Sequence, residues 1–138
     1  NPAAHVDALN IFFDAETKLD AHPDFVIDAI DSVPSKIALY KWCTAQQIPF
    51  AASMGAARKT DIGQIKISSI SRTTVCPLAA KIRRLSRESG LPDFPVVYST
   101  EIPTGQLSAN RTFGSIVTVT GTFGQMLANY AIDNIIAK

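Results

Sequence analysis

Two aspartates at the end of an apolar segment are the residues of this sequence best placed to do chemistry. Asp28 and Asp31 follow the apolar run at residues 25–27, and a helix-like pattern begins directly after them. A parallel strand is covered on both faces, so it reads as an unbroken apolar run. Carboxylates are costly inside such a strand but fit its carboxyl end, where open α/β sheets bind ligands. The pattern predicts a ligand site at the end of a strand over residues 24–31.

The two carboxylates are expected to have different roles, because residues three apart on a strand point to opposite faces. Asp31, last in the strand, is placed to hold Mg²⁺ or to orient phosphates, since Mg²⁺ is commonly bound by one or two carboxylates together with phosphate oxygens. A simpler interpretation stays open, because aspartates before helices often cap them. Asp28 is expected to be structural. Lys36 could reach the same phosphates, although a single helical lysine is more often solvated.

The elements around this strand end indicate an α/β fold. Ser32 is a candidate N-cap for a helix over residues 33–47, and the apolar residues 48–53 predict the next buried strand. Strand, helix and strand at this spacing form a parallel βαβ unit. Small residues follow at positions 54–57, where Gly55 would allow a ligand or a neighbouring backbone to approach closely. A loop that simply needs glycine is the alternative.

Three further segments are rich in strand-forming residues: 5–13, 64–70 and 94–100. A polar loop is expected over residues 102–111. The last segment, residues 114–138, is ambiguous by pattern alone. It begins with a strand-like run, but its later apolar residues follow helical spacing.

A basic amphipathic helix is predicted from Cys76-Pro77 to just before Gly90. Its polar side carries four cations and one anion: Lys81, Arg83, Arg84, Arg87 and Glu88. Such a face either follows a phosphate backbone or is simply the water-facing side of the helix. Arg58 and Lys59 would extend the basic patch if they fold beside it. Cys76 is interpreted as a packed cysteine at the helix start.

Composition limits the classes of function. The chain has 138 residues, 46% hydrophobic and 18% charged, and a net charge of +1, so one unit over residues 1–138 is expected and any nucleic-acid site must be local. Cys43 and Cys76 form neither a CxxC pair nor a Cys/His cluster, which indicates a reduced, cytoplasmic protein without structural zinc. No apolar run is long enough for a membrane span, and no signal peptide is recognised.

Five segments, in this order, resemble those of one family: DFVIDAIDSVPSK, SMGAARKTD, SRTTVCPLAAKIRR, VVYSTE and GTFGQMLANYAIDNI. The family is the tRNA threonylcarbamoyladenosine dehydratases, a branch of the ThiF/MoeB/HesA group of ubiquitin-activating-enzyme-like proteins. The resemblance covers essentially the whole chain. It implies the second half of a Rossmann-like domain, with a mixed sheet, flanking helices and one long buried C-terminal helix. In that helix Gly114, Gly121 and Gly124 are expected to permit close packing.

The resemblance also implies an activity. Members use ATP and Mg²⁺ to activate the carboxylate of the threonylcarbamoyl group on adenosine 37 of certain tRNAs, and ring closure follows with overall loss of water. The position of Asp31 contacts ATP phosphates and metal in the wider group, and Ser32 and Lys36 fall in the adjoining motif. The loop at Gly55 would face the nucleotide or the modified base. A homodimer that binds tRNA is the assembly implied.

The resemblance further implies that the family's glycine-rich nucleotide loop and ribose-binding acid lie upstream of these residues. The 138-residue chain is therefore expected to be the C-terminal portion of a ThiF-type domain, inactive alone and unable to bind ATP normally. One alternative is a ThiF/MoeB-type activator of a sulfur-carrier protein, although such proteins often carry paired CxxC ligands that this sequence lacks. Another is a non-catalytic fragment that binds tRNA or a partner protein through the basic helix.

Overall fold

A four-stranded mixed sheet lies at the centre of the fold. The computed structural model describes residues 1–103 and 114–137, and its strand order is β1-β2-β4-β3. The strands are β1 (Val26–Asp28), β2 (Phe50–Ser53), β3 (Ile65–Ser69) and β4 (Pro95–Ser99). β1, β2 and β4 are parallel, and β3 is antiparallel to β4. The predicted α/β class with a mixed sheet is confirmed.

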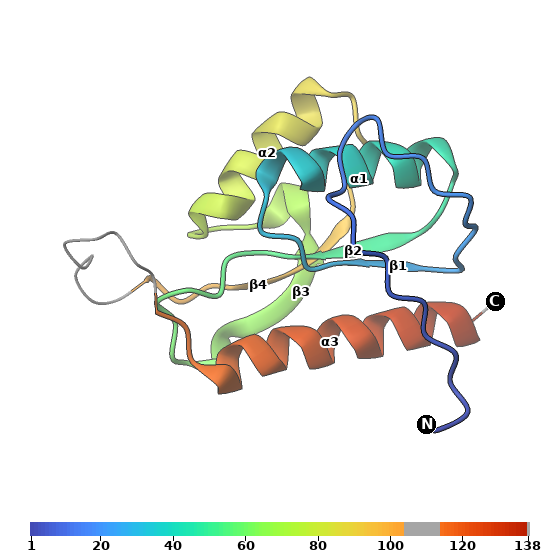
Figure 1. Cartoon of the computed structure of the whole chain (residues 1–138). Coiled ribbons are helices and arrows are strands. Elements are labelled where there is room, and N and C mark those ends of the chain that lie inside the picture. The colour runs from blue at the N-terminus through green and yellow to red at the C-terminus, as the bar shows by residue number, and fades with distance from the viewer. Residues whose placement is uncertain (104–113, 138) are drawn as a thin grey trace.

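Helices cover both faces of this sheet. α1 (Val33–Ala45) and α2 (Pro77–Glu88) pack on one face, and α3 (Val117–Ile136) crosses the other (Figure 1). Both predicted helix starts are confirmed. The Ser32 hydroxyl accepts a hydrogen bond from the backbone N–H of Ser35, and the Cys76 Sγ accepts one from Ala79. None of the helices described is both long enough and apolar enough to cross a membrane.

Successive residues of the buried strands face two separate cores, as the pleat of a sheet requires. In β4, Val96 and Tyr98 pack in the core under α1 and α2, whereas Val97 packs in the core under α3. Phe50 and Ala51 of β2 divide between the two cores in the same way. Burial on both faces explains why these strands read as continuous apolar runs in the sequence.

The strand predicted for residues 5–13 is wrong. This segment has no regular secondary structure, and Val6, Leu9 and Phe12 are exposed. A strand needs a neighbouring backbone with which to exchange hydrogen bonds, and β propensity cannot replace that neighbour. Among the described residues, β1 is the last strand on this side of the sheet. β1 is also shorter than the strand expected over residues 24–31.

The predicted long C-terminal helix is confirmed, but it is buried on one face only. One face of α3 is buried through Val119, Phe123 and Leu127, whereas Ile132 and Ile135 on the other side are about half exposed. The glycines of this segment do not pack closely, since a Cβ added at Gly114, Gly121 or Gly124 would meet no heavy atom within 4 Å. Helical spacing identified the element correctly, but a single covering sheet buries only one of its faces. From residue 104 on, the loop expected over 102–111 lies outside the described residues.

Candidate functional site

A cavity of about 470 Å³ lies where β1 and β2 end, at the carboxyl edge of the parallel part of the sheet. Its walls include Asp31, which follows β1, and Lys36 from α1. Ser53, Met54 and Gly55 line it from the end of β2. The structure therefore brings Asp31, Lys36 and Gly55 together at one cavity, at the edge where open α/β sheets bind ligands. We call it the strand-end cavity.

Of the two strand-end carboxylates, that of Asp31 is exposed. No described residue forms a hydrogen bond or ion pair with the Asp31 carboxylate, so both of its oxygens can accept ligands. Asp28, three residues earlier, is completely buried. The expectation that both residues lie on one strand is wrong, because β1 ends at Asp28 and Asp31 lies three residues beyond it. The turn after the strand, and not the alternation of strand residues, exposes Asp31.

Asp28 belongs to a buried polar network with Lys36 and Tyr40. Lys36 Nζ donates to Asp28 Oδ2 at 2.8 Å and to the Ser53 carbonyl at 2.9 Å, and the Tyr40 hydroxyl also donates to Asp28 Oδ2. Burial, and then the negative charge of Asp28, raises the pKa of Tyr40 far above its ordinary range. The Lys36 side chain is 1% exposed, and its ammonium group ties α1 to the ends of β1 and β2. It lines the cavity with its charge already paired.

Ser32 has a structural role as a helix cap, whereas Gly55 is not required by the fold. Ser32 caps α1 through its hydroxyl and does not line the cavity. Gly55 lines it, and a Cβ at this position would lie 3.4 Å from Cys76 Sγ and 3.7 Å from Leu78 Cβ, which are ordinary contacts. The φ angle of Gly55 is also outside the left-handed region. An alanine therefore fits the fold here, so any requirement for glycine would come from a ligand.

The donor set fits Mg²⁺ only when substrate phosphates complete the coordination. Within residues 1–103 and 114–137, no group of three acidic, histidine or cysteine side chains could hold a metal ion. Asp31 offers a single carboxylate, and Asp28 is occupied by Lys36 and Tyr40. Mg²⁺ is often bound by one or two carboxylates plus phosphate oxygens, so the site suits a nucleotide-bound ion.

Lys59 was expected in a basic patch, but its ammonium group lies inside the protein. It donates to the carbonyls of Ser99 at 3.3 Å and Glu101 at 2.6 Å, and burial lowers the pKa of Lys59. The Glu101 carboxylate in turn accepts from the backbone N–H groups of Thr60 at 2.9 Å and Asp61 at 3.0 Å. These contacts attach the loop after β2 to the end of β4. The carboxylate of Glu101 therefore holds this loop in place through its hydrogen bonds.

The cations predicted on α2 divide into two kinds. Arg83 is half-buried, and its Nη1 donates to the carbonyl and hydroxyl oxygens of Thr73 at 2.8 and 2.6 Å. Lys81, Arg84 and Arg87 are exposed, and Arg84 forms an exposed ion pair with Glu88 one turn later. The row Lys81–Arg84–Arg87 is the part of the predicted face that faces water. Arg58 is half-buried, in the loop next to Lys59.

Sequence reasoning missed the parts of the strand-end cavity that come from distant segments. Leu78 lines it from α2, Thr120 lines it from the first turn of α3, and Ser115 lines it from the segment just before that helix. No local pattern marks these residues, because only the packing of α2 and α3 on opposite faces of the sheet brings them to one place.

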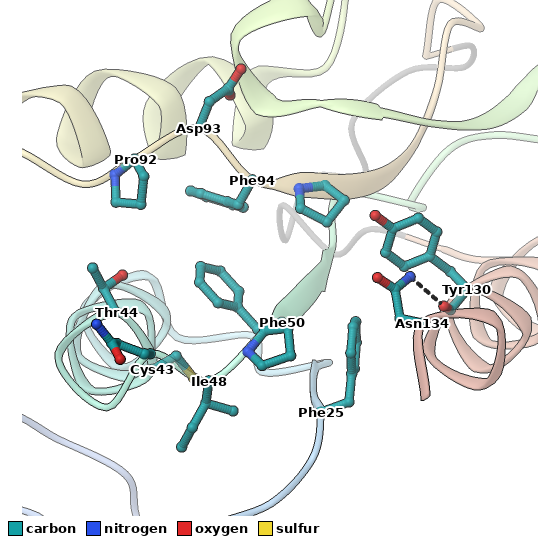
Figure 2. Close-up of a pocket in the computed structure, with 13 residues that line it drawn as sticks. Phe25, Cys43, Thr44, Ile48, Phe50, Pro92, Asp93, Phe94, Tyr130 and Asn134 are labelled. Atoms are coloured by element: carbon teal, nitrogen blue, oxygen red, sulfur yellow. Dashed lines mark hydrogen bonds between the residues drawn. The ribbon is translucent and has the colours of Figure 1, made fainter. Parts of the chain in front are cut away.

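A separate aromatic cavity of about 360 Å³ lies at the other edge of the sheet (Figure 2). Phe25, Phe50 and Phe94, each at or directly before the start of a strand, line it together with Tyr130 of α3. The Asn134 side chain there donates to the Tyr130 carbonyl at 2.8 Å. No residue predicted from the sequence as part of a site lines this cavity.

The sequence profile of the ThiF family matches residues 1–138. The tRNA threonylcarbamoyladenosine dehydratase of Bacillus subtilis is 40% identical over 107 residues, which cover 75% of this chain and 42% of that protein. The enzyme of the same name from Escherichia coli is 32% identical over 140 residues, covering 83% of this chain and 52% of that protein. The chain thus spans about half the length of these curated relatives.

Solved structures share the fold at a level well above chance similarity. The crystal structure of the Escherichia coli tRNA N6-threonylcarbamoyladenosine dehydratase in complex with AMP superposes with a TM-score of 0.89 at 31% identity. The complex of that protein with ATP gives a TM-score of 0.86 at 30% identity. Each comparison covers 99% of this chain and 59% of the solved one.

Proposed function

The chain belongs to the ThiF family, and from this premise we propose that it forms part of an ATP-dependent tRNA threonylcarbamoyladenosine dehydratase. The observation that carries the proposal is the exposed carboxylate of Asp31 at the strand-end cavity, which has no partner in the part of the chain that the structure describes. The ATP complex of a relative with the same fold supports a nucleotide as the ligand. The curated relatives carry the name of this dehydratase, which supports a modified adenosine of tRNA as the substrate.

The proposed reaction has two steps. A carboxylate oxygen of the threonylcarbamoyl group attacks the α-phosphorus of ATP, and pyrophosphate leaves. A nitrogen of the same group then attacks the activated carbonyl carbon, AMP leaves with the carboxylate oxygen, and the nitrogen loses its proton. The ring closes with overall loss of water and without a nucleophilic side chain. The protein's task is to position the reacting groups and to stabilise charge on the phosphates.

We assign these tasks within the strand-end cavity. Asp31 would bind Mg²⁺, and the ion would neutralise phosphate charge when bound. Gly55 would let the ligand approach the backbone after β2. Lys36 adds a positive charge at the wall while it holds the two strand ends, and Ser32 fixes the start of α1 behind Asp31. In this assignment the 138-residue chain provides one wall of the nucleotide site.

The tRNA would lie along the exposed cations of α2, Lys81, Arg84 and Arg87, with Arg83 beneath them. Arg58 and Lys59 lie in the loop after β2, next to residues that line the strand-end cavity, and we assign this loop a contact with the tRNA there, with Lys59 acting through its internal hydrogen bonds. A cytoplasmic location is supported by two buried free thiols, Cys43 and Cys76. A homodimer is supported by the exposed isoleucines of α3.

The direct test uses the gene product that contains this chain, incubated with ATP, Mg²⁺ and tRNA that carries threonylcarbamoyladenosine. Digestion to nucleosides and mass spectrometry should show a product lighter by one water, with AMP and pyrophosphate formed in equal amounts. Asp31→Asn should lower the rate by about a hundredfold or more, because the proposed metal ligand loses its charge. Gly55→Ala should retain the fold and weaken ATP binding.

Asp20→Asn is the matched control, since Asp20 is exposed and remote in sequence from the cavity residues. It should leave the rate unchanged. The proposal fails if the folded gene product forms no cyclised nucleoside, or if Asp31→Asn is as active as Asp20→Asn. ATP–pyrophosphate exchange that requires a sulfur-carrier protein and not tRNA would establish the carrier-activating alternative.

A further inference from the structure

A cavity of about 530 Å³ lies at the end of α2 that is remote from the strand-end cavity. Arg83, Ser86 and Arg87 line it from α2, and Ser71 and Asp93 line it from the segments next to β3 and β4. Cys76, at the start of α2, is close to Gly55, so the helix runs from one cavity to the other over about 18 Å, at 1.5 Å per residue. We call this second site the α2-end cavity.

Ser86 is the unusual residue of this cavity. Its side chain is 3% exposed, and its hydroxyl has no hydrogen-bond partner among the described residues. A buried hydroxyl without a partner is unfavourable, and such groups in folded proteins call for an explanation. Ser86 belongs to the cavity wall, but its hydroxyl oxygen is itself buried, so the side chain must change rotamer for a ligand oxygen to provide the missing partner.

The charges around Ser86 favour an anionic ligand. Both hydrogen bonds that Arg83 makes within the described part of the chain use Nη1, so its other nitrogens can serve a ligand. Arg87, one turn along, is exposed at the same cavity and pairs with no described residue. Paired guanidinium groups with a hydroxyl donor match the geometry of phosphate oxygens.

Asp93 is the opposing charge, and its carboxylate is occupied. It accepts hydrogen bonds from the Ser69 hydroxyl and from both the backbone N–H and the hydroxyl of Ser71. Burial would raise the pKa of Asp93, but these hydrogen bonds outweigh it and lower the pKa. The carboxylate is therefore ionised and directed to serines, and two arginines face the cavity against one aspartate.

We propose that the α2-end cavity binds a phosphate group of the tRNA backbone, with Arg87, Arg83 and the Ser86 hydroxyl as its donors. This inference rests on the proposed function. The exposed row Lys81–Arg84–Arg87 continues from the cavity along α2 toward the strand-end cavity, with neighbours three residues apart on the helix surface. A polyanion that spans both ends of α2 uses this row, whereas a free phosphate does not.

The test measures tRNA binding by the gene product that contains this chain, over a range of salt concentrations. Ser86→Ala changes no charge and should weaken binding about tenfold, the effect of losing one hydrogen bond to a charged group. Arg87→Gln should weaken binding and reduce the slope of log affinity against log salt by about one. Lys41→Gln is the control, because it removes the same charge from an exposed position on α1.

If Ser86 were needed for the fold, Ser86→Ala would lower the thermal midpoint of unfolding. The phosphate site predicts a different result. Removing an unsatisfied hydroxyl should leave the thermal midpoint unchanged or raise it, so a loss of tRNA affinity without a loss of stability supports the phosphate site. Equal tRNA affinities for Ser86→Ala, Arg87→Gln and Lys41→Gln would overturn the proposal. It would also be overturned if Ser86→Ala and Arg87→Gln weakened the binding of inorganic phosphate, measured by phosphorus NMR, but not the binding of tRNA. A gene product that binds no tRNA at all would instead refute the proposed function.

Discussion

Lys36 Nζ lies 2.8 Å from Asp28 Oδ2, and neither side chain is more than 1% exposed. The pair joins the first turn of α1 to the end of β1, and the same ammonium group reaches the Ser53 carbonyl at the end of β2. Asp28 Oδ1 also accepts from the backbone N–H of Ile30 at 2.9 Å, which shapes the turn that leads to Asp31. A buried ion pair therefore defines the edge of the sheet on which the candidate site is built.

Replacing Lys36 should destabilise the fold strongly. Lys36→Met leaves the Asp28 carboxylate buried without its cation, and breaking such a pair costs about 3–5 kcal/mol. Urea denaturation followed by circular dichroism would measure the loss. Lys41→Met, at an exposed position of the same helix, should change the free energy of unfolding by less than about 0.5 kcal/mol. Equal stabilities for the two variants would contradict the role assigned to the pair.

Tyr40 should make stability depend on pH in the alkaline range. Its folded pKa is raised, first by burial and then by Asp28, so the folded chain holds this proton after the unfolded chain has lost it. The stability linked to the proton is complete below about pH 10 and is lost above it, at up to about 1.4 kcal/mol per pH unit. Urea midpoints between pH 8 and about 11 should fall more steeply for the parent than for Tyr40→Phe. Parallel curves would refute this.

Glu101 should make stability depend on pH in the acid range, where stability falls as the pH is lowered. The hydrogen bond from the Asp61 N–H lowers the pKa of Glu101. Burial raises it, but hydrogen bonds from Thr60 lower it further, so the net shift is downward. Its contribution is present above about pH 4.3, the ordinary pKa of glutamate, and is lost as pH falls through the lower folded pKa. Amide hydrogen exchange at Thr60 and Asp61 should accelerate in Glu101→Gln at neutral pH. Unchanged exchange there, with Ser35 as an internal reference, would show that the carboxylate does not hold the loop.

The isolated 138-residue chain should bind ATP more weakly than the Escherichia coli relative whose ATP complex is known. Within the described residues, Asp31 is the one carboxylate that lines the strand-end cavity without a partner, and the chain spans 59% of that relative. Titration calorimetry of both proteins under the same Mg²⁺ concentration would measure the difference. An affinity equal to that of the relative would show that these residues hold the nucleotide without further walls.

Local physical effects made several features readable from the sequence. Ser32 and Cys76 cap helices because the first N–H groups of a helix need acceptors, and Gly90 follows α2 with φ +66° because that conformation favours glycine. The change from an apolar run to Asp28 and Asp31 identified the strand end, since an unpaired carboxylate is costly inside a buried strand. These features depend on neighbours within a few residues along the chain.

Other features depend on neighbours that are distant in sequence. Residues 5–13 have the composition of a strand but no strand partner among the described residues. The exposed cation expected at Lys59 is internal, because carbonyls about forty residues later, at Ser99 and Glu101, surround its ammonium group. Lys36 was predicted as a phosphate ligand from its position on α1, yet its partner Asp28 could be recognised only once β1 and α1 were packed together. The sequence by itself therefore determined where α1 and α2 begin and that Asp31 stands near the end of a buried strand, whereas tertiary packing decided which charges are paired and which remain available to a ligand.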